Sequence, residues 1–119
     1  MKSDFIIDKP QGKRWDFALD ILQEGKVFIY QGIAFVLDTK HKVLRCDVAV
    51  DVHDPRTITE QRAQTEFEAA KGIVDELIKD SNKFQKIVSG CKIKYSIVCD
   101  YDTGIMKLFS VLNGKVQKV

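Results

Sequence analysis

The sequence predicts a single α+β domain over residues 1–119, in which an antiparallel sheet of about five to six strands packs against one long and one shorter helix. Segments that alternate apolar and polar residues flank one long segment with helical periodicity. Gly, Asn and Asp residues stand at the joints between strands, as hairpin turns require. Hairpin-connected strands argue against parallel βαβ units. A chain of 119 residues, of which 45% are apolar, can bury such a core.

The first helix is predicted over residues 13–24, because Trp15, Ala18, Leu19 and Leu22 share one face and Gly25 follows where a helix can end. Residues 27–37 then favour strand, and Gly32 divides them into two strands or marks a bulge. Both faces of this segment are apolar, which is more surface than two helices on one side can cover. Either the first helix crosses to the other face, or the sheet curls, or this surface meets another protein chain.

Residues 43–54, VLRCDVAVDVHD, have the most regular alternation in the chain, and the polar residues 38–41 deliver the chain into them as a hairpin. The predicted buried face holds Leu44, Cys46, Val48, Val50 and Val52, and the opposite face holds Arg45, Asp47, Ala49, Asp51 and His53. The sheet is expected to stop at Pro55, because proline cannot donate a ladder hydrogen bond.

A long helix follows, with a predicted capping box at residues 57–60, TITE. Its apolar stripe consists of Ala63, Phe67, Ala70, Val74 and Leu77. Ser81 and Asn82 either end or kink the helix, or the stripe continues to a stop at Gly90.

The last third returns to strands. Residues 92–101 place Ile93, Tyr95, Ile97, Cys99 and Tyr101 on one face, and residues 102–104 form a turn to a partner strand over 105–112. Asn113 and Gly114 predict one more hairpin, to a short strand over 116–119.

Composition and charge restrict the possible functions. Three cysteines without a C-x-x-C pair fit a reducing compartment, and no segment is apolar enough to span a membrane, so a cytoplasmic location is expected. Residues 83–119 carry 7 Lys/Arg against 2 Asp/Glu, whereas residues 1–82 carry 12 against 15. An RNA- or DNA-binding module that uses Lys92, Lys94, Lys107, Tyr95 and Tyr101 is therefore one alternative. A core position for the tyrosines is favoured, so a nucleic-acid partner is not expected.

A small metal-dependent hydrolase or nuclease is the other alternative. Asp51 and His53 are two residues apart on a strand, about 7 Å, so they could share one metal if a neighbouring strand supplied a third ligand. A solvated row of side chains is the favoured interpretation. Residues 99–104 lack the glycine and glutamate of a calcium loop, and Cys46 and Cys99 fall on buried faces. No cofactor, metal or enzymatic activity is expected.

The lone α+β domain, the two-sided segment VFIYQGIAFVL and the terminal hairpin YSIVCDYDTGIMKLFSVLNG resemble, in general type, the small immunity proteins that neutralise bacterial contact-dependent or polymorphic toxins. The resemblance implies a cytosolic inhibitor whose partner is a cognate toxin and which covers the toxin's active site. A net charge of +2 departs from the acidic members that oppose nucleases. A homodimer through the surplus apolar sheet is also conceivable. The candidate partner-binding residues are Asp47, Asp51, His53, Asp54, Asp100 and Asp102.

Overall fold

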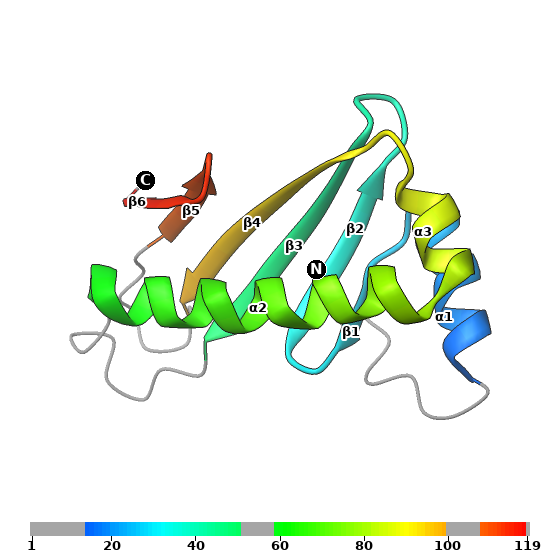
Figure 1. Ribbon diagram of the computed structural model, residues 1–119. Helices are drawn as coiled ribbons and strands as arrows, with labels where there is room; N and C mark the ends of the chain where they lie inside the picture. The colour runs from blue at the N-terminus through cyan, green and yellow to red at the C-terminus, as the bar shows by residue number, and fades with distance from the viewer. Residues whose placement is uncertain (1–13, 51–58, 100–107, 119) are drawn as a thin grey trace.

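A computed structural model describes residues 14–50, 59–99 and 108–118 of the chain, as three helices and six strands (Figure 1). The helices are α1 (Arg14–Gln23), α2 (Glu60–Asp80) and α3 (Asn82–Val88). The strands are β1 (Phe28–Tyr30), β2 (Ile33–Asp38), β3 (Val43–Val50), β4 (Lys92–Cys99), β5 (Leu108–Leu112) and β6 (Lys115–Lys118). The α+β class is confirmed. None of the described helices is long and apolar enough to cross a membrane.

The six strands form one sheet in the order β1-β2-β3-β4-β5-β6, and β3 and β4 run parallel while every other neighbouring pair is antiparallel. The prediction of a purely antiparallel sheet is therefore wrong at its centre. The chain returns through α2 and α3 between these two strands, as a βαβ unit requires. Both strands kept the alternation typical of antiparallel strands because α2 and α3 lie on only one face of the sheet.

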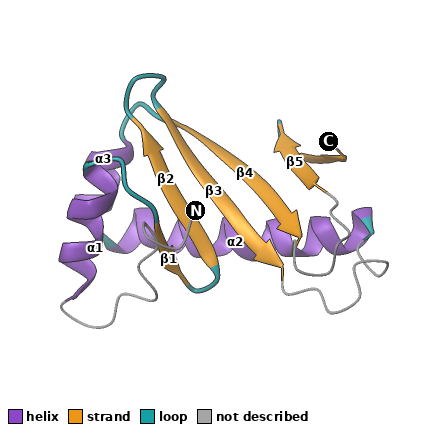
Figure 2. Ribbon diagram, turned by 180° about the vertical axis from the view of Figure 1, so that it is seen from behind, coloured by secondary structure: helices purple, strands orange, loops and turns teal. Residues whose placement is uncertain are grey.

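All three helices contribute to the same buried cluster, and the opposite face of the sheet has no described helix. Leu19 of α1, Val74 of α2 and Phe84 of α3 belong to one core together with Phe35 of β2. In Figure 2, seen from the opposite side, α2 lies behind the strands. The possibility that the first helix crosses to the other face is therefore excluded.

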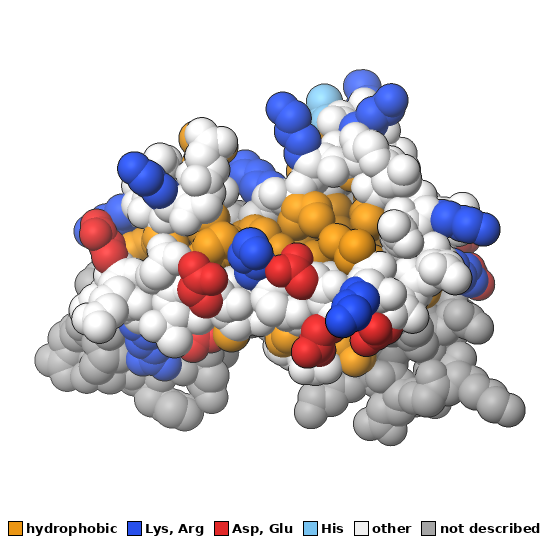
Figure 3. All heavy atoms as spheres, viewed as in Figure 1, with side chains coloured by type: hydrophobic (Ala, Val, Ile, Leu, Met, Phe, Trp, Pro, Cys, Tyr) orange, Lys and Arg blue, Asp and Glu red, His pale blue; other side chains and the backbone are white. Residues whose placement is uncertain are grey.

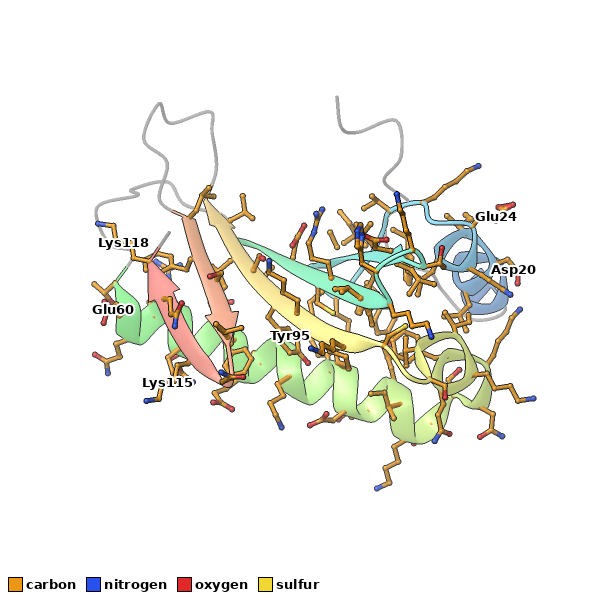
Figure 4. The ribbon with its side chains drawn as sticks, turned by 90° about the horizontal axis from the view of Figure 1, so that it is seen from above. Asp20, Glu24, Glu60, Tyr95, Lys115 and Lys118 are labelled. Carbon is orange, nitrogen blue, oxygen red and sulfur yellow. The ribbon has the colours of Figure 1, made fainter. Side chains whose placement is uncertain are left out.

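Ser81 separates α2 from α3, so the prediction of two helices is corrected to three. Its backbone is extended (φ −125°), which α-helix does not allow, and its N–H donates to the Leu77 carbonyl. The Ser81 hydroxyl then accepts a 3.1 Å hydrogen bond from the N–H of Phe84 and caps α3. The turn brings α3 beside α1, where Lys83 Nζ lies 2.7 Å from the carboxylate of Asp20, a residue that Figure 4 labels on α1.

The predicted stripe of α2 is confirmed, since its buried residues are Ala63, Phe67, Ala70, Val74 and Leu77. The N-cap is Thr59 rather than Thr57, and its hydroxyl accepts from the N–H of Arg62 at 3.2 Å. Thr57 lies outside the described residues.

Aromatic rings fix the helices to the sheet at two places. Phe35 stacks on Phe28 with ring centroids 5.2 Å apart and meets Phe84 edge-on at 6.1 Å. Phe67 of α2 meets Tyr95 of β4 edge-on at 5.1 Å, and Tyr95 is marked on its strand in Figure 4. The expectation that Tyr95 is a core residue is thereby confirmed.

Two predicted turns are present. Gly25 has φ +83°, and the N–H groups of Gly25 and Lys26 donate to the Leu22 and Ile21 carbonyls, which ends α1. Asn113 and Gly114 have φ +54° and +79°, the left-handed conformations of a two-residue hairpin between β5 and β6.

Candidate binding surface on the open face of the sheet

The face of the sheet opposite α2 is called the open face here, and its polar residues form rows across the strands. Val36 of β2, Arg45 of β3 and Lys94 of β4 are direct neighbours in one row. In a second row, Ala34, Asp47, Ser96, Ser110 and Gln117 lie opposite one another on five successive strands. The strands alternate their side chains, so both rows point away from the helices.

Arg45 and Lys94 are a like-charged pair at the centre of the sheet. They lie opposite one another in the parallel ladder, and Lys92, two residues before Lys94, lies on the same face of β4. Like charges directly opposite on neighbouring strands destabilise a sheet. The two central strands therefore carry an electrostatic cost at this point, which a bound anion would relieve.

Asp47 is the nearby carboxylate that partly offsets this charge. Its Oδ2 accepts a 3.0 Å hydrogen bond from Arg45 Nε, and its side chain is 21% exposed against 50% for Arg45. The other oxygen, Oδ1, is buried and has no hydrogen-bond partner. Burial raises the pKa of Asp47 more than the charges of Arg45 and Lys94 lower it. A buried acceptor without a hydrogen-bond partner carries a desolvation cost.

Two shallow hollows meet at Arg45 and Lys94. One, of about 580 Å³, extends to the β2–β3 hairpin and is lined there by Asp38, Lys40 and His41 among others. The second, of about 340 Å³, extends across Asp47, Ser96 and Ser110 toward β5. Because both are lined by Arg45 and Lys94, these two cations stand where the hollows join.

The hairpin at the far end of the larger hollow is held by Asp38 and His41. The carboxylate of Asp38 accepts from the His41 backbone N–H at 3.1 Å and lies 2.7 Å from its ring Nδ1. These bonds lower the pKa of Asp38, the side-chain bond most of all. His41 is thus engaged within its own turn. It is exposed, as is expected for a polar loop.

Of the six candidate residues from the sequence, Asp47 is the one that the structure describes. Asp51, His53, Asp54, Asp100 and Asp102 lie outside the described residues, as do Tyr101 and Lys107. β3 and β4 end side by side, since Val50 pairs with Cys99, one residue before Asp51 and Asp100. The charged side chains that act on Asp47 among the described residues are both cations, Arg45 and Lys94. This part of the predicted site therefore does not present an acidic surface.

The metal and cysteine candidates have the following outcomes. Within residues 14–50, 59–99 and 108–118, no three His, Cys, Asp or Glu side chains gather as metal ligands do. Cys46 is fully buried, and burial raises its thiol pKa far above the usual range, as the prediction of a core cysteine requires. Cys91 is half-buried beside the core.

The alternation in the sequence predicted that Arg45 and Lys94 are exposed, but it did not indicate that they lie next to each other. Each alternates onto the polar face of its strand, and only the parallel pairing of β3 with β4 sets one against the other. The predicted antiparallel sheet did not imply that β3 and β4 are neighbours.

On the helix side, hydrophobic side chains gather above α2, in the hollow between the β2–β3 hairpin and β5–β6 (Figure 3). Ile73 of α2 and Ile93 of β4 are half-buried side chains that pack against the core. On α2 itself, six Asp/Glu and three Lys/Arg make the helix net acidic. The helix side and the open face thus differ in charge.

The chain has no significant match among protein-family models, curated proteins or solved structures.

Proposed function

We propose that this protein is a protein-binding inhibitor of the immunity type, which neutralises a cognate toxin by covering its active site. The observation that carries the proposal is the open face of the sheet. Half-buried apolar side chains on β1 and β2, Ile29, Ala34 and Val36, border the charged pair Arg45 and Lys94 there. Protein interfaces combine an apolar core with a polar rim, and arginine is enriched in them.

The described residues of the open face are better suited to cover a partner's active site than to catalyse a reaction. Its hollows are broad and shallow, and its two described carboxylates are already engaged, Asp47 with Arg45 and Asp38 with His41. A flat surface of this kind fits a partner's surface over many contacts. Leu112, on the same face of β5, is 58% exposed and offers an apolar contact at its margin.

The test is neutralisation of a defined partner. The product of a toxin-like gene adjacent to this one is expressed in cells with and without the protein, and the purified pair is examined by size-exclusion chromatography with light scattering. We expect restored growth and a complex of fixed stoichiometry. Continued toxicity despite full expression of the protein, with no complex at micromolar concentration, would refute the proposal.

A further inference from the structure

The open face has one place where the described residues are electrostatically incomplete. Arg45 and Lys94 are paired residues on the two central strands. Within the described part of the chain, the side chain of Arg45 makes one hydrogen bond, from Nε to Asp47. A guanidinium has five N–H donors, so the Nη groups retain their hydrogen-bonding capacity. One carboxylate, Asp47, stands against two cations.

We propose that Arg45 and Lys94 form the recognition site for a carboxylate side chain from an acidic segment of the partner protein. This inference rests on the proposed function, because it names the surface and the chemistry of that partner. It differs from the sequence-based expectation, in which aspartates of this chain contact a basic site.

Geometry supports a carboxylate at this position. Arginine presents paired donors that match the two oxygens of a carboxylate, and Lys94 adds a second positive charge from the neighbouring strand. A carboxylate bound between these two side chains would offset the excess positive charge of the pair.

A nucleic-acid strand fits this face less well. The outward positions of β3, β4 and β5 hold Arg, Lys, Asp, Ser, Val and Leu among their described residues, with no aromatic ring on which a base could stack. Tyr95 lies on the opposite face against Phe67.

A second copy of the chain is a poorer occupant as well. Within the described part of the chain, α2 is a net acidic element, and it lies on the other side of the sheet (Figures 1 and 2). Contact between α2 of one copy and the open face of another would be head-to-tail and would leave both surfaces free at the ends. Such contacts extend into filaments unless they close into a ring.

The first experiment uses a defined acidic probe. A hexaglutamate peptide is titrated into ¹⁵N-labelled protein at low salt, with hexaglutamine as the uncharged control. We expect amide shift changes centred on β3 and β4 around Arg45 and Lys94, absent with hexaglutamine. An Arg45→Gln/Lys94→Gln variant should weaken binding about tenfold or more, since two charged contacts are lost.

A matched variant controls for net charge. Lys71→Gln/Lys79→Gln removes two positive charges from the exposed side of α2 and should leave hexaglutamate binding within about twofold. The inference is overturned if both double variants weaken binding equally, because the peptide then responds to overall charge. It is also overturned if an oligonucleotide of six thymidines binds the same site more tightly than hexaglutamate does.

The second experiment separates this inference from the proposed function. The same two variants are compared with the wild type in neutralisation of the adjacent toxin-like product and in the Kd of the complex. If the wild type neutralises and Arg45→Gln/Lys94→Gln does so equally well, the function stands and the inference fails. If hexaglutamate binds at Arg45 and Lys94 but no toxin is neutralised, the acidic-ligand site stands and the proposed function fails.

Discussion

Substitution of Lys94 by glutamate tests the pairing of the two central strands and the electrostatic cost at the open face. In the structure the introduced carboxylate would stand directly opposite Arg45, because Arg45 pairs with Lys94 in the parallel ladder. The substitution replaces a like-charged pair with an oppositely charged pair. We therefore expect Lys94→Glu to stabilise the fold while it weakens binding of an acidic ligand.

The magnitude follows from three contributions. Charged pairs directly opposite on neighbouring strands change stability by about 0.2–1 kcal/mol in either direction, so the reversal of sign gains up to about 2 kcal/mol. Lys94 also attracts Asp47 and lowers its pKa, an attraction that the substitution turns into repulsion. Solvent screens Arg45, which is 50% exposed. We expect a net gain of about 0.5–1 kcal/mol at low salt.

Urea unfolding of a double-mutant cycle measures this effect. In an Arg45→Ala background, Lys94→Glu should no longer stabilise the protein, since the new carboxylate then faces only Asp47. In 1 M NaCl, where charges are screened within about 3 Å, the difference between the backgrounds should largely disappear. Equal changes in the free energy of unfolding in both backgrounds at low salt, within about 0.3 kcal/mol, would show that the residues are not neighbours and would refute the parallel pairing.

Three further predictions concern the core, the helix cap and the pH dependence. Phe35→Ala should cost about 3–5 kcal/mol in urea unfolding, because its buried ring joins β1, β2 and α3, and Phe35→Leu should cost clearly less. Thr59→Ala should cost about 1 kcal/mol and Thr57→Ala less, since the hydroxyl of Thr59 caps α2; the reverse order would contradict this cap. The carboxyl of Asp47 should titrate above its usual range by NMR, and its midpoint should rise further in Arg45→Ala. Because the raised pKa means that the folded state binds this proton more tightly, the stability that Asp47 contributes is present below pH 4 or so and is lost as pH rises through the folded pKa.

The local structure was largely predictable from the sequence. The helix at Arg14–Gln23, the stripe of α2 and the turns at Gly25 and Asn113 follow from side-chain period and backbone preference, which act over a few residues. The position of the α2 N-cap could not be predicted from the sequence, because Thr57 and Thr59 have the same capping chemistry. The choice between them depends on where the chain leaves the sheet.

The candidate site was predictable only in part. Asp47 was correctly placed on the outward face of β3, but its neighbours were not known. Its charged neighbours are two cations, Arg45 on β3 itself and Lys94 on β4, which is nearly fifty residues away in the sequence. The candidate aspartates were chosen from the alternation within single strands. That choice could not take account of neighbouring charges, because they depend on which strands are adjacent.

The sequence by itself determined which face of β3 and of β4 is buried, since side chains alternate with a period of two whatever the strand pairs with. It also determined the apolar stripe of α2, but it left open whether that helix ends at Ser81. The order and direction of the strands were decided only by the tertiary structure. α2 and α3 pack on one face and return the chain parallel to β3, so that β4 takes the central position beside it. This packing places Arg45 against Lys94, because strand adjacency depends on long-range burial rather than on local pattern.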